Sequence, residues 1–291
     1  MRIAYFLRRR GREQNFVRFC RNRIIAGERM KKNCQELNPR IQRKLPAIAV
    51  SDERGVRSLH VGGEAIQSSM KIGDPFALAL DYTRCMMAFL LFHPEPRHAL
   101  MIGLGGGSLV KFFFKRLRRT RVRVVELDPR IVATARAHFA LPPDDARLAV
   151  EIGDGAEALA PECCDVLVVD AYHDEAHVPE LATAEFYDAA FLALEPRGAL
   201  VVNFMDDDPR FDQYMRRLES AFGGAVLAMR ALYDPNIVAF GLKGLPPSLE
   251  WEELRRRAER LESRLGLPFS RYVKRLRSMN RSSGASLLLA G

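Results

Sequence analysis

The sequence has little cysteine, a single tryptophan and no long apolar run. None of its five cysteines belongs to a CxxC pair, and the adjacent Cys163 and Cys164 lack the spacing of a zinc site. The longest apolar run, residues 86–92, is far shorter than the roughly 20 residues needed to cross a bilayer. The first residues are basic but lack the apolar segment of a signal peptide. We therefore expect a cytoplasmic protein with reduced thiols, no bound metal and no membrane span.

Acidic residues are scarce at both ends of the chain, whose formal net charge is +9. Residues 1–44 hold 14 Lys and Arg against 3 Asp and Glu, and residues 251–291 hold 10 against 4. The segment between them is acidic. The ends are thus expected to be a basic arm and a basic tail, able at most to bind nucleic acid or anionic surfaces weakly. They show neither interleaved aromatic residues nor a known nucleic-acid-binding motif.

The middle of the chain alternates apolar, strand-like segments with amphipathic, helix-like ones. The predicted strands are 98–104, 122–127, 148–152, 165–170, 199–204, 226–232 and 237–242, and helices are predicted at 76–92, 108–118, 129–139, 183–194 and 210–222. Such alternation predicts an α/β fold with a doubly wound, mostly parallel seven-stranded sheet. Its last two strands are separated by a turn alone, so they are expected to form an antiparallel hairpin.

Four parts are expected along the chain. They are a basic arm at 1–44, a small β element at 45–75, a nucleoside-binding transferase domain at 76–245, and amphipathic helices with a basic tail at 246–291. The small β element is predicted from strands at 56–61 and 64–69. The last helices are predicted from the helical spacing of apolar residues after Trp251 and after Pro268.

A glycine-rich turn, Gly103 to Ser108, follows the first strand of this sheet and precedes a helix. Gly103, Gly105 and Gly107 would let the backbone approach a ligand closely, and the helix N-terminus favours electron-rich groups. The match to GxGxxG is imperfect, because Ser108 takes the place of the third glycine. Taken alone, the turn is equally consistent with a structural role.

Three acidic residues at the ends of later strands favour a nucleoside site. Glu126 ends the second strand, where a carboxylate can bind ribose hydroxyls. Asp154, followed by Gly155, is placed to accept a hydrogen bond from an adenine amino group. Asp170 ends the fourth strand, which should neighbour the first, so that it faces Gly103 across the crevice where doubly wound sheets bind ligands. Asp128, before Pro129, is interpreted as a helix N-cap instead.

From about residue 46 to residue 242 the sequence resembles the spermidine synthases, the polyamine aminopropyltransferases, with their class I methyltransferase-like fold. The matching segments are 63–68, 103–108, 124–129, 153–155, 168–170 and 183–187. The resemblance implies that decarboxylated S-adenosylmethionine is the co-substrate and that an amine or polyamine accepts the aminopropyl group. It also implies that Gln67 and the glycine loop hold the thioether end of the nucleoside, that Asp170 binds the attacking amine, and that the enzyme is a homodimer.

The sequence departs from the family where the family binds its diamine. The glycine loop contains no aspartate, and residues 81–83 are Asp-Tyr-Thr where the family has Tyr-His-Glu. The second acid of the family's Asp-x-x-Asp pair is replaced by His173. His173 is therefore a candidate base, Tyr172 a candidate stacking residue and the loop 171–180 a candidate lid. Two other functions stay open: an S-adenosylmethionine-dependent methyltransferase of unknown acceptor, and a nucleoside-binding protein without catalysis.

Overall fold

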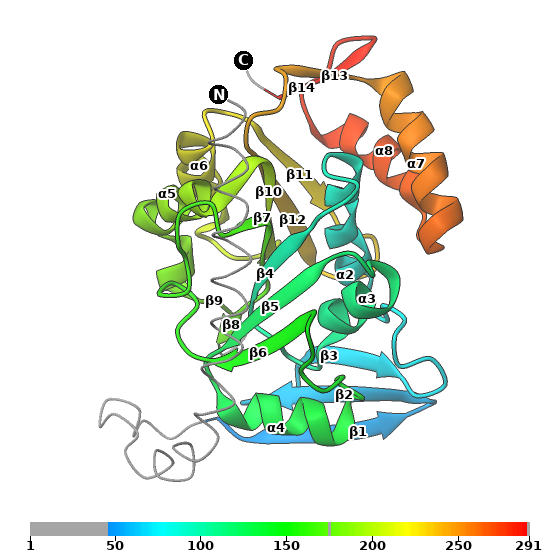
Figure 1. Cartoon of the computed structure of the whole chain (residues 1–291), viewed down its shortest axis with the longest axis vertical. Helices are drawn as coiled ribbons and strands as arrows, with labels where there is room; N and C mark the ends of the chain where they lie inside the picture. Colours follow the sequence, from blue (N-terminus) through cyan, green and yellow to red (C-terminus); the bar gives the residue numbers. More distant parts are fainter. Residues whose placement is uncertain (1–45, 174–175, 290–291) are drawn as a thin grey trace. The chain divides into compact units, whose positions relative to one another are not determined.

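A seven-stranded sheet runs through the computed structural model, which describes residues 46–173 and 176–289 (Figure 1). The predicted basic arm at 1–44 lies outside the described residues. In spatial order the strands are β11 (Val226–Arg230), β12 (Asn236–Leu242), β10 (Leu194–Met205), β7 (Cys164–Val169), β4 (His98–Ile102), β5 (Arg121–Glu126) and β6 (Leu148–Ile152). The strands from β10 to β6 are parallel, while β12 runs antiparallel to both β10 and β11. The predicted doubly wound sheet with its closing hairpin is confirmed.

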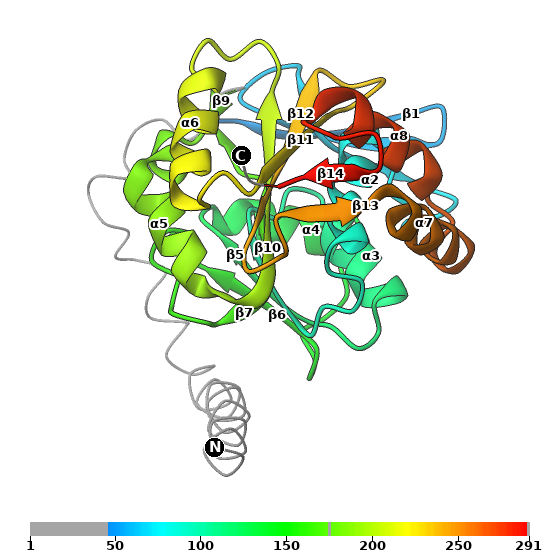
Figure 2. The ribbon, with the colours of Figure 1, turned by 90° about the horizontal axis from the view of Figure 1, so that it is seen from above.

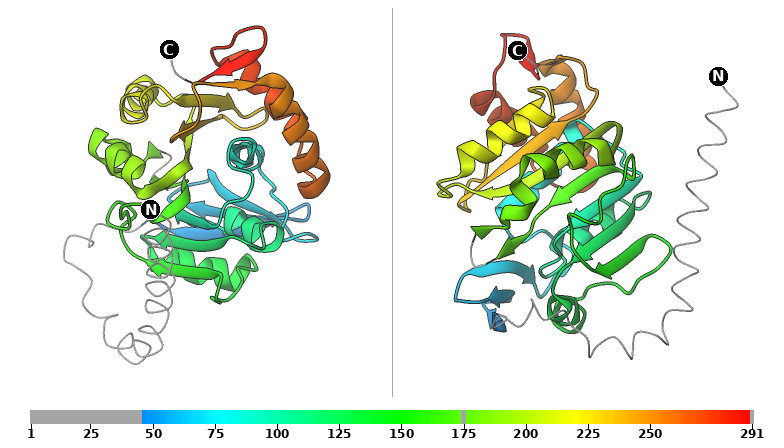
Figure 3. Two further views of the ribbon diagram at one scale, coloured as in Figure 1. Left: turned by 45° about the horizontal axis from the view of Figure 1, so that its top comes forward. Right: turned by 90° about the vertical axis from the view of Figure 1, so that its left-hand side faces the viewer.

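Helices cover both faces of this sheet, because alternate strand residues point to opposite sides (Figures 2 and 3). On β4, Ala99 and Met101 join one apolar core, whereas Leu100 and Ile102 join the other. The first core lies under α3 (Ser108–Arg116), α4 (Pro129–His138), α7 (Trp251–Leu265) and α8 (Phe269–Met279). The second lies under α5 (Ala184–Ala193) and α6 (Phe211–Ala221).

A small antiparallel sheet precedes the large one. Its strands are β1 (Ile48–Glu53), β2 (Val56–Val61) and β3 (Ile66–Lys71). The sequence pattern predicted two of these strands and missed β1. Ser108, the first residue of α3, donates from Oγ to the carbonyl of Ser69 at 3.2 Å, so β3 is fixed against the glycine loop.

The helix predicted at 76–92 is shorter than expected. Helix α2 (Asp81–Met86) begins five residues late and continues as the 3-10 helix η3 (Met87–Leu91). Before it, the carbonyls of Leu78 and Ala79 accept hydrogen bonds from the Arg84 side chain, both at 2.8 Å. Asp74 followed by Pro75 is a sequence pattern that favours a helix start. In the structure Asp74 instead forms a turn, because its N–H donates to the carbonyl of Lys71 at 3.2 Å and its carbonyl accepts from the N–H of Ala77 at 3.1 Å.

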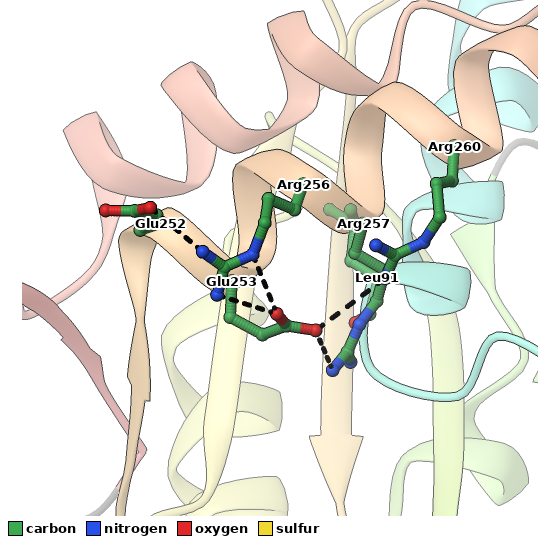
Figure 4. Close-up of polar contacts among 6 residues, drawn as sticks. All are labelled: Leu91, Glu252, Glu253, Arg256, Arg257 and Arg260. Carbon is green, nitrogen blue, oxygen red and sulfur yellow. Dashed lines mark hydrogen bonds and ion pairs between the residues drawn. The ribbon is translucent and has the colours of Figure 1, made fainter.

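The predicted C-terminal helices form an antiparallel pair on the first core. Five apolar side chains of α7 are buried at helical spacing, and Arg257 donates to the carbonyl of Leu91 in η3. Glu253 accepts from Arg256 and Arg257 on the same helix (Figure 4). Such exposed ion pairs contribute little stability, so burial of the apolar face holds α7 in place.

The remaining short elements flank these layers. They are β8 (Tyr172–His173), β9 (Ala176–His177) and η4 (Pro179–Ala182) after β7, and β13 (Ser248–Glu250) paired with β14 (Ser286–Leu288) beside α7. None of the helices in the described part of the chain is both long enough and apolar enough to span a membrane.

Candidate active site

The glycine loop lies where β4 and β7 end side by side. Gly103 has φ +92°, and a Cβ there would overlap the carbonyl oxygen of Asp170 and lie 2.9 Å from its carbonyl carbon. The two neighbouring strands therefore come together at a point where only glycine fits. This places Asp170 opposite the start of the loop, as the predicted strand order requires.

The other glycines of the loop pack against side chains of nearby elements. Gly105 and Gly107 also have positive φ, at +51° and +68°. A Cβ on Gly105 would lie 3.5 Å from Cβ of Ser68, and one on Gly107 would lie 2.8 Å from Cδ1 of Leu141. Ser68 thus contacts the loop, and Gln67, the residue before it on β3, is half-buried.

Glu126 supports the loop from the end of β5. Its Oε2 accepts from the backbone N–H of Leu104 at 2.8 Å, and its Oε1 accepts from that of Asp128 at 3.0 Å. Burial raises the pKa of Glu126, while these two backbone hydrogen bonds act in the opposite direction. A carboxylate has about four acceptor positions, so Glu126 can still accept hydrogen bonds from hydroxyl groups.

Exposed apolar side chains flank Glu126. Leu127 and Ile152 are 68% and 57% exposed, and Ile152 pairs with Glu126 in the sheet register. Two apolar side chains exposed beside a carboxylate can enclose a flat apolar group such as a nucleobase.

Asp154 and Gly155 follow β6 at the same edge of the sheet. Asp154 is exposed, and its Oδ1 accepts from the backbone N–H of Ala156 at 2.8 Å. A Cβ on Gly155 would overlap the side chain of Ile102 at the end of β4. Gly155 is thus required by packing, whereas Asp154 keeps acceptor positions open to solvent. Asp128 accepts from the backbone N–H of Arg130, which confirms its interpretation as an N-cap.

Asp170 has two side-chain partners at the end of β7. Asn203 on β10 donates from Nδ2 to its Oδ1 at 2.9 Å, and the Tyr82 hydroxyl donates to its Oδ2 at 3.3 Å. Asn236 on β12 in turn donates to Oδ1 of Asn203 at 3.0 Å. Burial raises the pKa of Asp170 to about 6, and the bonds from Asn203 and Tyr82 only partly oppose this.

The sequence analysis missed Asn203 and Asn236 as parts of this site, whereas Tyr82 belongs to the segment 81–83 that stands where the family has Tyr-His-Glu. Asn203 had a usable signal, because it is a polar residue inside an otherwise apolar strand segment. Asn236 gave none, since only the folded chain brings β12 to the end of β7.

Tyr172 and His173 form strand β8 and are separated from Asp170 by Ala171 alone. Their backbone pairs antiparallel with β9, so a hairpin stands in the predicted lid segment. Their side chains lie outside the described part of the structure. No group of three or more His, Cys, Asp or Glu in the described ranges is arranged to hold a metal ion.

A cavity of about 360 Å³ lies elsewhere, between α7 and α8. Its lining residues, Trp251, Arg255, Glu259, Ser270, Val273, Lys274 and Arg277, include none of the predicted site residues. The candidate site is therefore defined by converging strand ends and not by this cavity.

Comparisons with known proteins agree with this geometry. A seven-stranded sheet with a glycine loop after its first strand and acids after later strands defines a nucleoside-binding enzyme of the class I methyltransferase-like type. Residues 80–225 match the spermine/spermidine synthase domain, and the chain belongs to this family.

Two relatives match over almost their whole length. The polyamine aminopropyltransferase of Chromobacterium violaceum is 36% identical over 84% of this chain and 95% of the relative. That of Neisseria meningitidis serogroup A is 34% identical over 82% of this chain and 92% of the relative. A crystal structure of spermidine synthase in complex with the transition-state analogue AdoDATO has the same fold, with a TM-score of 0.64 at 21% identity, and covers 81% of this chain and 83% of that one.

Proposed function

We propose that this protein transfers an aminopropyl group from decarboxylated S-adenosylmethionine to a small amine or polyamine, in polyamine biosynthesis. Support comes from relatives named polyamine aminopropyltransferase that match nearly end to end. The observation that carries the proposal is Asp170, a carboxyl group held by Asn203 and Tyr82 opposite Gly103. This arrangement suits a reaction between a cationic nucleoside and an amine.

The reaction is a displacement at the carbon next to the sulfonium. The amine nitrogen forms the new C–N bond, the C–S bond breaks with its electron pair going to sulfur, and methylthioadenosine leaves. The nitrogen becomes cationic, and Asp170 takes the released proton. Since no covalent intermediate forms, the protein acts by orienting the amine and by placing a carboxylate beside the developing positive charge.

The nucleoside is assigned to the other predicted residues. Gln67 and the loop from Gly103 to Gly107 hold its sulfur end, Glu126 the ribose, and Asp154 and Gly155 the adenine side. Tyr172 and His173 are assigned to the amine side of the crevice. These assignments follow the family resemblance. For Gly103, Glu126, Asp154 and Asp170 they are supported by the position of these residues at or after the carboxyl ends of the neighbouring parallel strands β4, β5, β6 and β7.

Replacing Glu126 by Gln should weaken nucleoside binding by about tenfold to a hundredfold, since a hydrogen bond to a charged group contributes roughly 1.5–3 kcal/mol. Calorimetric titration with methylthioadenosine measures this. Glu157→Gln is the matched control, because Glu157 is exposed in the adjacent turn. Equal affinities for the wild type and Glu126→Gln would remove Glu126 from the nucleoside site.

The raised pKa of Asp170, about 6, predicts a pH dependence of the amine reaction. The free amine is mostly protonated below its own pKa of about 10, so log kcat/KM for the amine should rise with slope one across neutral pH. Below about pH 6 Asp170 also becomes protonated, and the slope should steepen to two. If His173→Ala keeps the change of slope near pH 6, the titrating group is Asp170. If His173→Ala loses this change of slope, the titrating group is His173.

Calorimetry with three nucleosides tests the proposed reaction. Decarboxylated S-adenosylmethionine and methylthioadenosine should bind more tightly than S-adenosylmethionine. Tight binding of S-adenosylmethionine alone would overturn aminopropyl transfer and favour methyl transfer, which the acid-free glycine loop would then explain. Binding of none of the three would overturn both enzyme functions.

A further inference from the structure

The C-terminal helices lie outside the segment that matches the family domain, yet α8 contacts two elements that adjoin those of the candidate site. The matched segment ends at residue 225, and α8 begins at Phe269. Helix α8 packs against η3, which continues α2, and against β11, whose following turn leads to Asn236. Figure 2 shows α8 beside β11 and β12.

A chain of polar contacts leads from α8 to the start of α2. Arg275 donates from Nη1 to Sγ of Cys85 at 3.3 Å, and the Cys85 thiol lies 3.8 Å from Oδ2 of Asp81, to which it donates. Burial raises the pKa of Cys85 to about 12, so Cys85 stays a thiol that can donate and accept at once. Asp81 also accepts from the backbone N–H of Leu232 at 2.6 Å, in the turn between β11 and β12.

The residue after Asp81 reaches the reactive carboxyl group. The hydroxyl of Tyr82 donates to Asp170, and its backbone N–H donates to Oδ2 of Asp234 at 2.8 Å. Asp81 on α2 thus accepts a hydrogen bond from the turn, and Asp234 in the turn accepts one from α2. Two hydrogen bonds therefore join α2 to the turn. The same turn precedes Asn236, which bonds Asn203 behind Asp170.

The end of α8 holds β11 independently. Asn280 accepts from the backbone N–H of Ala228 at 2.8 Å and donates to the carbonyl of the same residue at 2.9 Å. Both strands of the hairpin that carries the turn are therefore fixed: β11 by α8, and β12 by its pairing with β10. Between these two strands, the side chains of Asp81 and Asp234 join the turn to α2.

Stability alone does not account for the Arg275 contact. Nη2 of Arg275 and the hydroxyl of Tyr272, one helical turn earlier, are buried without a hydrogen-bond partner among the described residues. Buried, partly satisfied polar groups cost free energy, and apolar side chains of similar size would usually pack there at no loss. A polar link that lowers stability is best explained by what it positions.

We propose that Arg275 is a positioning residue, which acts through Cys85 and Asp81 to hold Tyr82 and the 231–235 turn around the Asp170 carboxyl group. The proposal rests on the proposed aminopropyl transfer. It assigns the C-terminal helix α8 to the amine side of the site and leaves the nucleoside side, at β5 and β6, independent of it.

The test is steady-state kinetics of the full-length protein with Arg275→Met, and with Lys274→Met as the charge-matched neighbour on α8. Arg275→Met should lower kcat/KM for the amine about tenfold or more, because small misplacements of reacting groups are costly. Its Kd for methylthioadenosine should stay within about twofold of the wild type. Loss of the Tyr82 hydrogen bond should also move the acidic break of the pH profile upward. Lys274→Met should behave like the wild type.

Cys85 variants test the same link if Arg275→Met folds poorly. Cys85→Ser retains a hydroxyl that can accept from Arg275 and donate to Asp81, so it should stay near the wild type, whereas Cys85→Ala should resemble Arg275→Met. The double variant Arg275→Met with Cys85→Ala should lose no more kcat/KM for the amine than either single variant, because both substitutions break the same link. Wild-type kinetics in Arg275→Met and Cys85→Ala, or equal losses in amine kinetics and methylthioadenosine affinity, would overturn the positioning role alone. A wild-type protein without turnover would overturn the proposed function itself, and the role with it.

Discussion

Asp170→Asn should lower kcat for aminopropyl transfer by about a thousandfold, within the range of 10² to 10⁴ expected for loss of a general base. Asparagine is isosteric with aspartate but cannot take a proton from the reacting nitrogen. Because the nucleoside contacts are assigned to the loop, β5 and β6, the Kd for methylthioadenosine should change by several-fold at most. Steady-state kinetics and calorimetry on one preparation give both numbers.

The exposed Asp207, which follows β10 at the same edge of the sheet, provides the control for Asp170→Asn. Asp207→Asn removes the same charge and should leave kcat and Kd unchanged. Comparable losses of rate and nucleoside binding in Asp170→Asn would instead make Asp170 a structural residue.

Asp170→Asn should also stabilise the folded protein. Between about pH 4 and pH 6, Asp170 stays protonated when folded but ionises when unfolded, so its contribution to the free energy of unfolding falls as pH rises. At pH 7 the ionised, buried carboxylate of Asp170 lowers the free energy of unfolding by its full amount. This amount is up to about 3 kcal/mol for a pKa raised from 3.8 to about 6. Asp170→Asn should therefore unfold at higher denaturant concentration at pH 7, with the gain vanishing near pH 4. A loss of stability at pH 7 would contradict the burial cost inferred for this group.

Gly103→Ala should abolish nucleoside binding and destabilise the fold. Its φ of +92° disfavours any Cβ, and the Cβ would overlap the carbonyl oxygen of Asp170. Backbone strain and overpacking each cost about 1–3 kcal/mol, so the free energy of unfolding should fall by roughly 2–6 kcal/mol. Urea unfolding measures the loss.

Gly223→Ala separates the cost of backbone strain at positive φ from the cost of steric overlap. Gly223 also has positive φ, at +58°, but a Cβ there would meet nothing within 4 Å. This variant should lose about 1 kcal/mol and keep nucleoside affinity. Equal stability losses in Gly103→Ala and Gly223→Ala would mean that overlap of the Cβ with the Asp170 carbonyl adds no cost beyond backbone strain.

The sheet was predictable because each of its strands carries its own apolar pattern. Residues such as Val166 and Val168 contribute to one core while Leu167 and Val169 contribute to the other, so the strand is apolar on both faces. The strand order followed from the doubly wound connections. The glycine loop was predictable for a related reason, since a glycine-rich turn between a buried strand and a helix is a local signal.

Features that depend on contacts between distant segments were not predictable. The late start of α2 depends on Arg84 binding carbonyls before the helix, and strand β1 is almost wholly exposed, without the buried residues of β2 and β3. The partners of Asp170 come from α2 and β10, 88 and 33 residues away in sequence. Hydrogen bonds of this kind leave no periodicity in the sequence.

The most direct test of the account is product analysis. The protein is incubated with decarboxylated S-adenosylmethionine and a panel of amines, and the products are identified by mass spectrometry. We predict stoichiometric methylthioadenosine and an amine carrying one added aminopropyl group, both formed about a thousandfold more slowly by Asp170→Asn. A methylated product with S-adenosylmethionine, and none from the decarboxylated compound, would contradict the account.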